Sequence, residues 1–370
     1  MGELRESLLK QQLQREIEIA KKLEMEGKIK QAGTHYKIAA SIYKRLAAIS
    51  PRETATSFLD VASQYESLSE NVEKIEKLKP EIIENMFICE RPTTKWDDIG
   101  GLEEVKKEVR EAVILPMIKS KPSFIQLTRT MLLYGPPGTG KTLIAKAASN
   151  TLKANFLEAK TSTLLSKFYG ESEKIINILF EKARRNAPSI IFMDEFDALM
   201  ISREMGVHEA SRRVISQLLI EIEGFSTKKD EKVILIAATN RPWDLDEAML
   251  SRFQRKIYVP LPDFESRKQI FEIHLKEASL EGISFDNLAE KSEGFSGRDI
   301  ANVCREAIMH MIREENPDLD KISESEIDKY QLKYRSILKK DFDYAFSKIK
   351  KTVDEKMIKK YEEWKEKFGM

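Results

Sequence analysis

The first eighty residues carry apolar side chains at helical spacing and contain no strand-like alternation. Three stretches have this pattern, and their apolar positions are Leu9, Leu13, Ile17 and Ala20; Tyr36, Ala39, Tyr43 and Leu46; and Phe58, Ala62, Tyr65, Leu68, Val72 and Ile75. Residues spaced in this way share one face of a helix. Because short turns join helices into antiparallel neighbours, the pattern predicts a three-helix bundle over residues 1–79.

The pattern changes after residues 80–92, which are expected to form a linker. Short apolar runs then alternate with helical patterns, and most runs end in polar residues. The runs are MLLYG (131–135), NFLEA (155–159), SIIFMDE (189–195), VILIAATN (233–240) and KIYVPLP (256–262). Apolar strands separated by helices are typical of a parallel sheet. We therefore expect an α/β domain over residues 93–262. Beyond Asp263 the strand signals stop, and we expect a small helical lid domain with a C-terminal helix over residues 263–370.

Composition narrows the class of protein. Lys and Arg together number 62 against 61 Asp and Glu, so the net charge of +1 does not indicate a general nucleic-acid surface. The only cysteines, Cys89 and Cys304, form no C-x-x-C pair, which fits a reduced, cytoplasmic compartment. The start MGELRESLLK lacks the apolar segment of a signal peptide. No apolar run approaches the roughly 20 residues that span a bilayer, so contact with membranes is expected only through partners.

A phosphate-binding motif, GPPGTGKT, spans residues 135–142 and matches G-x-x-x-x-G-K-[ST]. It follows a strand-like run and precedes a helix-like one. Glycines let backbone N–H groups approach phosphate oxygens at a helix N-terminus. Lys141 should reach the β- and γ-phosphates, and Thr142 should ligate Mg²⁺. The nucleotide contacts expected here are Gly135, Pro136, Pro137, Gly138, Thr139, Gly140, Lys141, Thr142 and Leu143.

Two later strands also end in polar residues. Asp194 and Glu195 follow the run IIFM, and Asn240 ends VILIAATN. Asp194 is expected to hold Mg²⁺, Glu195 to activate the attacking water, and Asn240 to position that water or the γ-phosphate. ATP and Mg²⁺ are therefore the expected cofactors. A kinase would need a pocket for a hydroxyl acceptor, whereas a glutamate beside the metal aspartate favours hydrolysis; Asn240 could alternatively cap a turn.

With these motifs the chain resembles the AAA family of ATPases from Trp96 to about Pro262 and again over the helical lid. The resemblance implies an α/β P-loop NTPase core, a helical lid and an N-terminal bundle. It adds nucleotide contacts in WDDIGG, FEIHL and GFSGRDI: Asp98, Ile99, Gly100, His274, Gly297 and Arg298. The alternative for His274 is a helix residue with local hydrogen bonds. Arg252 matches the arginine finger that acts on the ATP of a neighbouring subunit. Ser251 stands where close relatives carry a second arginine, and Arg255 is a possible substitute.

A finger that acts in trans implies a ring, and the AAA family forms hexamers. SKFYGESEK (166–174) is similar to the first pore loop of this family and would place Phe168 and Tyr169, next to Lys167, in a central channel. REMGVHEASRR would form the second pore loop with His208 near its tip. The alternative is that one of the two aromatic rings packs into a side pocket.

Three features resemble the subfamily that disassembles ESCRT-III filaments in vacuolar protein sorting. They are the C-terminal KYEEWKEKFG, the EASRR segment, and a bundle similar to a microtubule-interacting and trafficking (MIT) domain. The eukaryotic enzymes of this subfamily carry a β-domain inserted in the lid, and the stretch Glu315–Leu338 is too short and polar for one. The resemblance therefore points to the archaeal cell-division version, the Cdv ATPase. The implied function is a hexamer that pulls ESCRT-III-like subunits through its pore, recruited by partners to membrane necks or a division site. The alternatives are a microtubule-severing enzyme, a proteasome-type unfoldase, and a non-catalytic scaffold that uses ATP only to assemble.

Overall fold

The structure is a computed structural model, and its described part leaves gaps along the chain. It describes residues 2–25, 29–50, 52–76, 87, 89–118, 120, 122, 124–125, 127–160, 172–201, 208–227, 231–323 and 327–368. The chain divides into two compact units. One comprises residues 1–87 with 164–179, and the other comprises residues 88–163 with 180–370.

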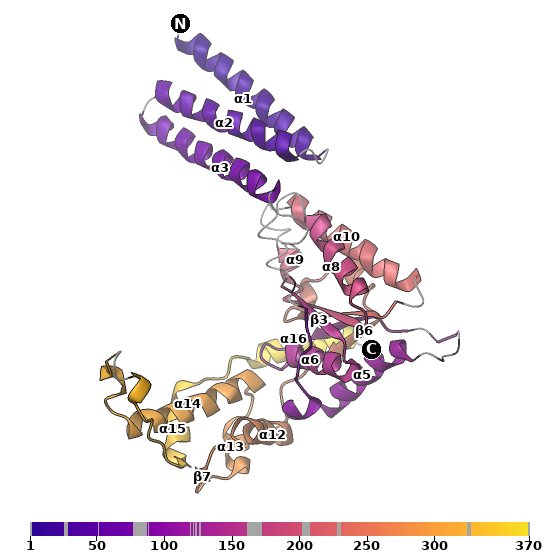
Figure 1. Cartoon of the computed structure of the whole chain (residues 1–370), viewed down its shortest axis with the longest axis vertical. Coiled ribbons are helices and arrows are strands. Elements are labelled where there is room, and N and C mark those ends of the chain that lie inside the picture. Colours follow the sequence, from indigo (N-terminus) through magenta and orange to yellow (C-terminus); the bar gives the residue numbers. More distant parts are fainter. Residues whose placement is uncertain are drawn as a thin grey trace. The chain divides into compact units, whose positions relative to one another are not determined.

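The N-terminal helices lie side by side in the first unit (Figure 1). They are α1 (Gly2–Met25), α2 (Ile29–Ile49) and α3 (Arg52–Glu76). Leu13, Ala39 and Leu46 are buried between them. The ring of Tyr43 lies 6.1 Å from that of Phe58 and 5.6 Å from that of Tyr65. The three helices expected from apolar spacing are confirmed.

A six-stranded sheet forms the centre of the second unit, in the order β1-β3-β4-β5-β2-β6. The strands are β1 (Cys89–Glu90), β2 (Thr130–Tyr134), β3 (Asn155–Lys160), β4 (Ser189–Asp194), β5 (Val233–Thr239) and β6 (Arg255–Tyr258). All pairings are parallel except that of β1, which is antiparallel to β3. The five apolar runs are therefore the parallel strands. The edge strand β1 lies inside the stretch expected to be a linker. Its pattern could not be recognised in the sequence, because two residues are too few to show alternation.

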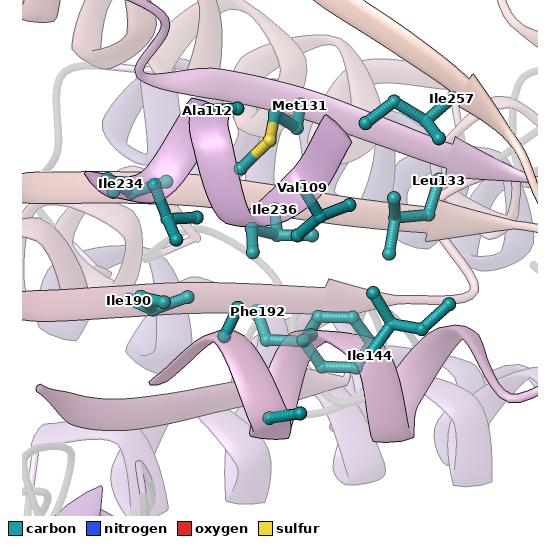
Figure 2. Close-up of a cluster of buried hydrophobic side chains, with 14 of the residues drawn as sticks. Val109, Ala112, Met131, Leu133, Ile144, Ile190, Phe192, Ile234, Ile236 and Ile257 are labelled. Atoms are coloured by element: carbon teal, nitrogen blue, oxygen red, sulfur yellow. The ribbon is translucent and has the colours of Figure 1, made fainter. Parts of the chain in front are cut away.

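Helices α5 (Glu103–Ile114) and α6 (Lys141–Leu152) contribute to the apolar core on one face of this sheet (Figure 2). Val109 of α5 lies by Ile236 of β5, and Ile144 of α6 lies by Phe192 of β4, in a cluster that also includes Met131 and Leu133 of β2. Tyr134, the next residue of β2, instead lies against Trp364 of α16 (Glu355–Phe368), with ring centroids 4.5 Å apart. Both faces are covered, which explains why the strands are continuous apolar runs.

The remaining elements of the α/β part are short or lie between the strands. They are η1 (Trp96–Asp98), η2 (Leu115–Met117), α8 (Ser172–Arg185), α9 (Ala198–Ile201), α10 (His208–Thr227), η3 (Pro242–Asp244) and α11 (Glu247–Leu250). Among the described residues, no helix combines the length and apolar character needed to cross a membrane.

The C-terminal third is mostly helical and surrounds its own core, which includes Phe271, Val303 and Phe342. Its elements are α12 (Phe264–His274), β7 (Leu280–Glu281), α13 (Phe285–Lys291), α14 (Gly297–Glu315), η4 (Leu319–Lys321), η5 (Ile327–Lys329), β8 (Ile337–Leu338) and α15 (Lys339–Lys348). This part also contains two short strands, β7 and β8, which pair in parallel although no strand signal appears in the sequence beyond residue 263. Each has only two residues, too few to show a period of two.

Candidate active site

The loop between β2 and α6 has a backbone that only glycine accommodates easily. Gly135, Gly138 and Gly140 have φ angles of 148°, 78° and 93°. A Cβ on Gly135 would lie 2.2 Å from the carbonyl oxygen of Val259, and one on Gly138 would lie 2.6 Å from Ser296 Oγ. The loop therefore wraps closely at the N-terminus of α6, where the helix dipole and free N–H groups favour an anion.

Lys141 begins α6 and is only 7% exposed. Its Nζ donates hydrogen bonds to the carbonyl oxygens of Gly135 at 2.8 Å and Pro136 at 2.7 Å. Burial lowers the pKa of Lys141 to about 7, against the opposing effect of Asp194 and Asp197. A buried ammonium group is costly without an anionic partner. The site is therefore electrostatically suited to phosphate.

Oxygen ligands for a divalent cation meet beside this lysine. Thr142 Oγ1 lies 3.3 Å from Asp194 Oδ2, and Asp194 Oδ1 accepts a hydrogen bond from the N–H of Glu195 at 2.9 Å. Glu195 has a φ of 52°, unusual for a residue with a Cβ, and its side chain is exposed. Hydroxyl and carboxylate oxygens are the ligands that Mg²⁺ prefers. Thr142 and Asp194 thus fit a magnesium ion, and Glu195 stands next to them.

Asn240 follows β5, the neighbour of β4 in the sheet. Its carbonyl oxygen accepts a hydrogen bond from the hydroxyl of Tyr361. The preceding residue, Thr239, donates from Oγ1 to Asp197 Oδ1 at 2.6 Å and accepts at the same oxygen from Arg241 N at 2.9 Å. The ends of two adjacent parallel strands therefore bring Asn240 to the side of Asp194.

Most of the expected site residues line one cavity of about 350 Å³. They are Asp98, Ile99, Gly100, Pro137, Gly138, Thr139, Gly140, Lys141, Thr142, Leu143, Asp194, Glu195, Asn240, His274, Gly297 and Arg298. Gly135 and Pro136 contribute through their carbonyl bonds to Lys141. This volume is in the range of small-molecule sites.

Six lining residues were not expected: Leu102, Pro260, Pro262, Ile270, Ile273 and Ala301. They are apolar and give the cavity a wall that suits an aromatic base. Ile270 lies about one helical turn before His274, and Ile273 lies directly before it. These positions are the only signal in the sequence that points to the two residues. In sequence, such residues cannot be distinguished from lid core.

The lid closes the cavity through the N-terminus of α14. Arg298 N donates to the carbonyl oxygen of Gly138 at 3.0 Å. Ser296 and Asp299 cap the helix reciprocally, with Ser296 N to Asp299 Oδ2 at 3.0 Å. His274 lines the cavity from the end of α12. Desolvation of its ring, and then the charge of Arg305, lowers the pKa of His274, although the residue as a whole is exposed. A neutral imidazole is thus favoured there.

The structure leaves the finger candidates outside this cavity. Arg252 is ion-paired with Glu223 of α10, and Arg255 Nη1 lies 3.2 Å from Glu108 Oε1 of α5. Ser251 donates from Oγ to the carbonyl oxygen of Ala248 at 2.8 Å. Action of Arg252 on a neighbouring subunit stays a prediction.

The side chains of the pore candidates are not among those that the structure describes. Lys167, Phe168 and Tyr169 lie outside the described part of the chain. His208 is the first residue of α10, but its side chain is not among those described. The expected roles of these four residues remain predictions.

Three family models match parts of the chain between residues 131 and 369. Residues 131–261 match the "ATPase family associated with various cellular activities (AAA)", and residues 282–329 match the "AAA+ lid domain". Residues 313–369 match the "Vps4 C terminal oligomerisation domain".

Among curated proteins, the chain is 42% identical over 300 residues to the A-like 1 form of the katanin p60 ATPase-containing subunit of Sorex araneus. It is 39% identical over 300 residues to the A1 form of the katanin p60 ATPase-containing subunit of Arabidopsis thaliana. Each alignment covers 78% of this chain but only 61% and 57% of the respective relative, so the chain spans about three fifths of their length.

Two solved structures are also similar. The FIGL-1 AAA domain matches with a TM-score of 0.66 and 36% identity, covering 77% of this chain and 92% of that one. A structure described as "Structural Basis for Katanin Self-Assembly" matches with a TM-score of 0.63 and 34% identity, covering 77% and 95%.

These relatives correct the expected function. The prediction of an ATPase that disassembles ESCRT-III-like filaments is wrong, because the curated relatives described above are katanin subunits and one of the similar structures concerns katanin self-assembly. The finer resemblance to an archaeal cell-division ATPase finds no support among them. The C-terminal helix misled because a chain can match the Vps4 C-terminal model and still be 42% identical to katanin. The phosphate loop, the paired carboxylates, the lid and the 36% identity to the FIGL-1 AAA domain together show that the chain belongs to the AAA family of ATPases, enzymes that hydrolyse ATP.

Proposed function

We propose that this chain is a Mg²⁺-dependent ATP hydrolase that assembles into a hexamer and remodels a protein polymer, as a microtubule-severing enzyme does. The proposal of ATP hydrolysis rests on one observation. Five side chains suited to that reaction line the same cavity: Lys141, Thr142, Asp194, Glu195 and Asn240. Each of these residues comes from a strand end or the adjoining helix start. In an open parallel sheet, that edge is where ligands bind.

Each residue has a defined task in this proposal. Lys141 binds the β- and γ-phosphates, and Thr142 with Asp194 holds Mg²⁺. Magnesium, when bound, neutralises charge on the phosphates. Glu195 accepts a proton from the attacking water, while Asn240 orients that water. The apolar wall and His274 receive the base and ribose.

Self-association is supported by the match to an oligomerisation domain and by similarity to a katanin structure whose description concerns self-assembly. Arg252 fits a role across a subunit boundary, because it lies outside the cavity of its own chain and is partly exposed. An arginine supplied in trans is worth roughly 10³ to 10⁵ in turnover in related phosphoryl transfer.

The substrate is proposed from the katanin relatives, which favour the microtubule-severing alternative. Residues 1–79 act as an adaptor that resembles a microtubule-interacting and trafficking domain, joined by residues 80–92 to the large domain (93–262) and the lid (263–370). Lys167, Phe168, Tyr169 and His208 grip the polypeptide in the pore, because aromatic rings offer apolar contact without demanding one sequence. The self-assembled ring would then pull subunits out of the polymer.

Glu195→Gln tests the hydrolase. The variant keeps ATP binding, since glutamine is isosteric, but loses about 10²- to 10⁴-fold in turnover because no base accepts the proton. Glu277→Gln, at an exposed lid position outside the cavity, is the control and keeps the wild-type rate. Undiminished turnover in Glu195→Gln refutes the assignment.

Polymerised tubulin tests the substrate. Wild-type protein with ATP should shorten microtubules under the microscope, whereas Phe168→Ala should keep basal turnover and lose shortening. Intact microtubules in the presence of an active wild-type ATPase refute the substrate and leave the hydrolase standing.

A further inference from the structure

Tyr361 of the C-terminal helix α16 contacts the strand end that presents Asn240. The tyrosine is fully buried, at 0% exposure, and its hydroxyl donates to the carbonyl oxygen of Asn240, 121 residues away in sequence. Asn240 lines the same cavity as Asp194 and Glu195. A side chain far from the phosphate motifs therefore binds the backbone of a site residue.

The ring of Tyr361 packs against two other aromatic rings. Its centroid lies 5.0 Å from that of Trp243 and 6.0 Å from that of Tyr258. Trp364, on the same helix, packs against Tyr134. Burial raises the pKa of Tyr361 above its usual value of 10.0. Its hydroxyl is therefore a donor fixed in position and stays protonated at any working pH.

The peptide that follows Asn240 is bound at both ends. Its C=O accepts from Tyr361, and its N–H, which belongs to Arg241, donates to Thr239 Oγ1 at 2.9 Å. Thr239 Oγ1 is in turn fixed by Asp197 at 2.6 Å. Fixing a peptide plane fixes ψ of the residue before it, and hence the direction of the side chain relative to the strand. Two hydrogen bonds thus hold the backbone from which the Asn240 side chain projects.

We propose that Tyr361 is a positioning residue for Asn240 in ATP hydrolysis, so that the seating of α16 controls turnover rather than nucleotide binding. The inference rests on the proposed hydrolase. Because this hydrogen bond holds the backbone of Asn240 and lies outside the phosphate loop, we expect its loss to act on the chemical step.

Tyr361→Phe is the test, because it removes the hydroxyl and keeps the ring. We expect kcat to fall roughly three- to tenfold, the equivalent of one neutral hydrogen bond, with KM for ATP changed less than about twofold. Tyr258→Phe is the matched control. It removes the hydroxyl of the adjacent tyrosine ring, which has no bond to Asn240, and keeps the wild-type kcat. Sedimentation at the assay concentration checks that assembly is equal in all variants.

A double-mutant cycle with Asn240→Ala separates positioning from general structure. If Tyr361 acts through the Asn240 amide, Tyr361→Phe has no further effect once that amide is removed. Additive losses, a change in KM alone, or wild-type kcat in Tyr361→Phe each overturn the inference. Absence of turnover in the wild type, or normal turnover in Glu195→Gln, instead overturns the hydrolase itself.

Discussion

A buried carboxylate in the lid, Asp341, offers a prediction whose size follows from its contacts. Asp341 is 0% exposed and accepts two hydrogen bonds from Arg335, at 2.7 and 3.0 Å, and one from His310 Nδ1 at 2.7 Å. The N–H of Leu338 adds a fourth bond at 2.8 Å. His310, Glu314 and Asp341 are close enough to hold a metal, but the guanidinium of Arg335 already pairs with both carboxylates and supplies the positive charge.

Asp341→Asn should destabilise the packing of α14 against α15. Removing one partner of a buried ion pair costs about 3–5 kcal/mol, and we expect about 3 because Arg335 retains Glu314 and Glu315. Against the cost of burial, Arg335, Leu338 and His310 hold the pKa of Asp341 down from 3.8 to about 2. At about 1.4 kcal/mol per pKa unit, this lowering contributes roughly 2.5 kcal/mol.

The sign of the pH dependence follows from the lowered pKa. Above pH 4 the carboxylate is charged in both the folded and the unfolded chain, so its full contribution is present. As the pH falls towards 2, the unfolded chain takes up a proton first, and the contribution is lost. The other charged groups near this cluster are Glu314, Glu315 and Lys340, together with His310. The gap in stability between wild type and Asp341→Asn should therefore be constant from pH 5 to 7 and narrow below pH 4.

Hydrogen exchange of the α14 and α15 amides measures this local stability without assuming that the whole chain unfolds at once. Asp318→Asn is the control, because its ion pair with Lys321 is about 70% exposed on both sides and should contribute under about 1 kcal/mol. A gap below about 1 kcal/mol at pH 6, or one that does not narrow between pH 4 and 2, would contradict the assigned role of Asp341.

Two further substitutions test the phosphate loop and the seating of α16. Gly135→Ala places a Cβ 2.2 Å from Val259 O at a φ of 148°, so the affinity for a fluorescent ATP analogue should fall at least roughly tenfold. Gly282→Ala, with φ of 65° but open space, should cost about 1 kcal/mol and leave that affinity intact; equal effects at both glycines would refute the steric argument. Trp364→Ala, at a site 6% exposed, should cost about 3–5 kcal/mol in urea unfolding. The control is Glu366→Ala at an exposed position of the same helix, which should cost under about 0.5 kcal/mol. If Trp364→Ala were as stable as Glu366→Ala, α16 would not be anchored by Trp364.

The sheet could be predicted because its central strands are covered on both faces. Burial on both sides makes β4 and β5 continuous apolar runs that stop at the polar residues of the site. The strands β1, β7 and β8 have two residues each, so they leave no pattern and exist only through their partners. Local sequence therefore predicts a strand well when the strand is long enough and buried enough to require a run of apolar residues.

The same reasoning separates the two halves of the cavity. The phosphate half needs glycine, lysine and hydroxyl side chains in consecutive positions, a combination that few sites other than a phosphate loop require. The base half needs only apolar contact, and Ile270 and Ile273 look like any other helix residues that face a core. The assignment to ESCRT-III failed for a similar reason, since an amphipathic C-terminal helix does not specify the polymer on which an AAA ring acts.

The helix α16 shows where such prediction stops. Apolar spacing places Met357, Tyr361, Trp364 and Phe368 on one face, and the burial of Tyr361 and Trp364 agrees with that face. Spacing treats these rings as equivalent, because periodicity reports burial and nothing else. The sheet makes them different, because it brings the end of β5 to the hydroxyl of Tyr361 and the ring of Tyr134 to the ring of Trp364. A contact over 121 residues depends on strand order, so only the folded chain distinguishes a packing tyrosine from one that also holds the backbone of Asn240.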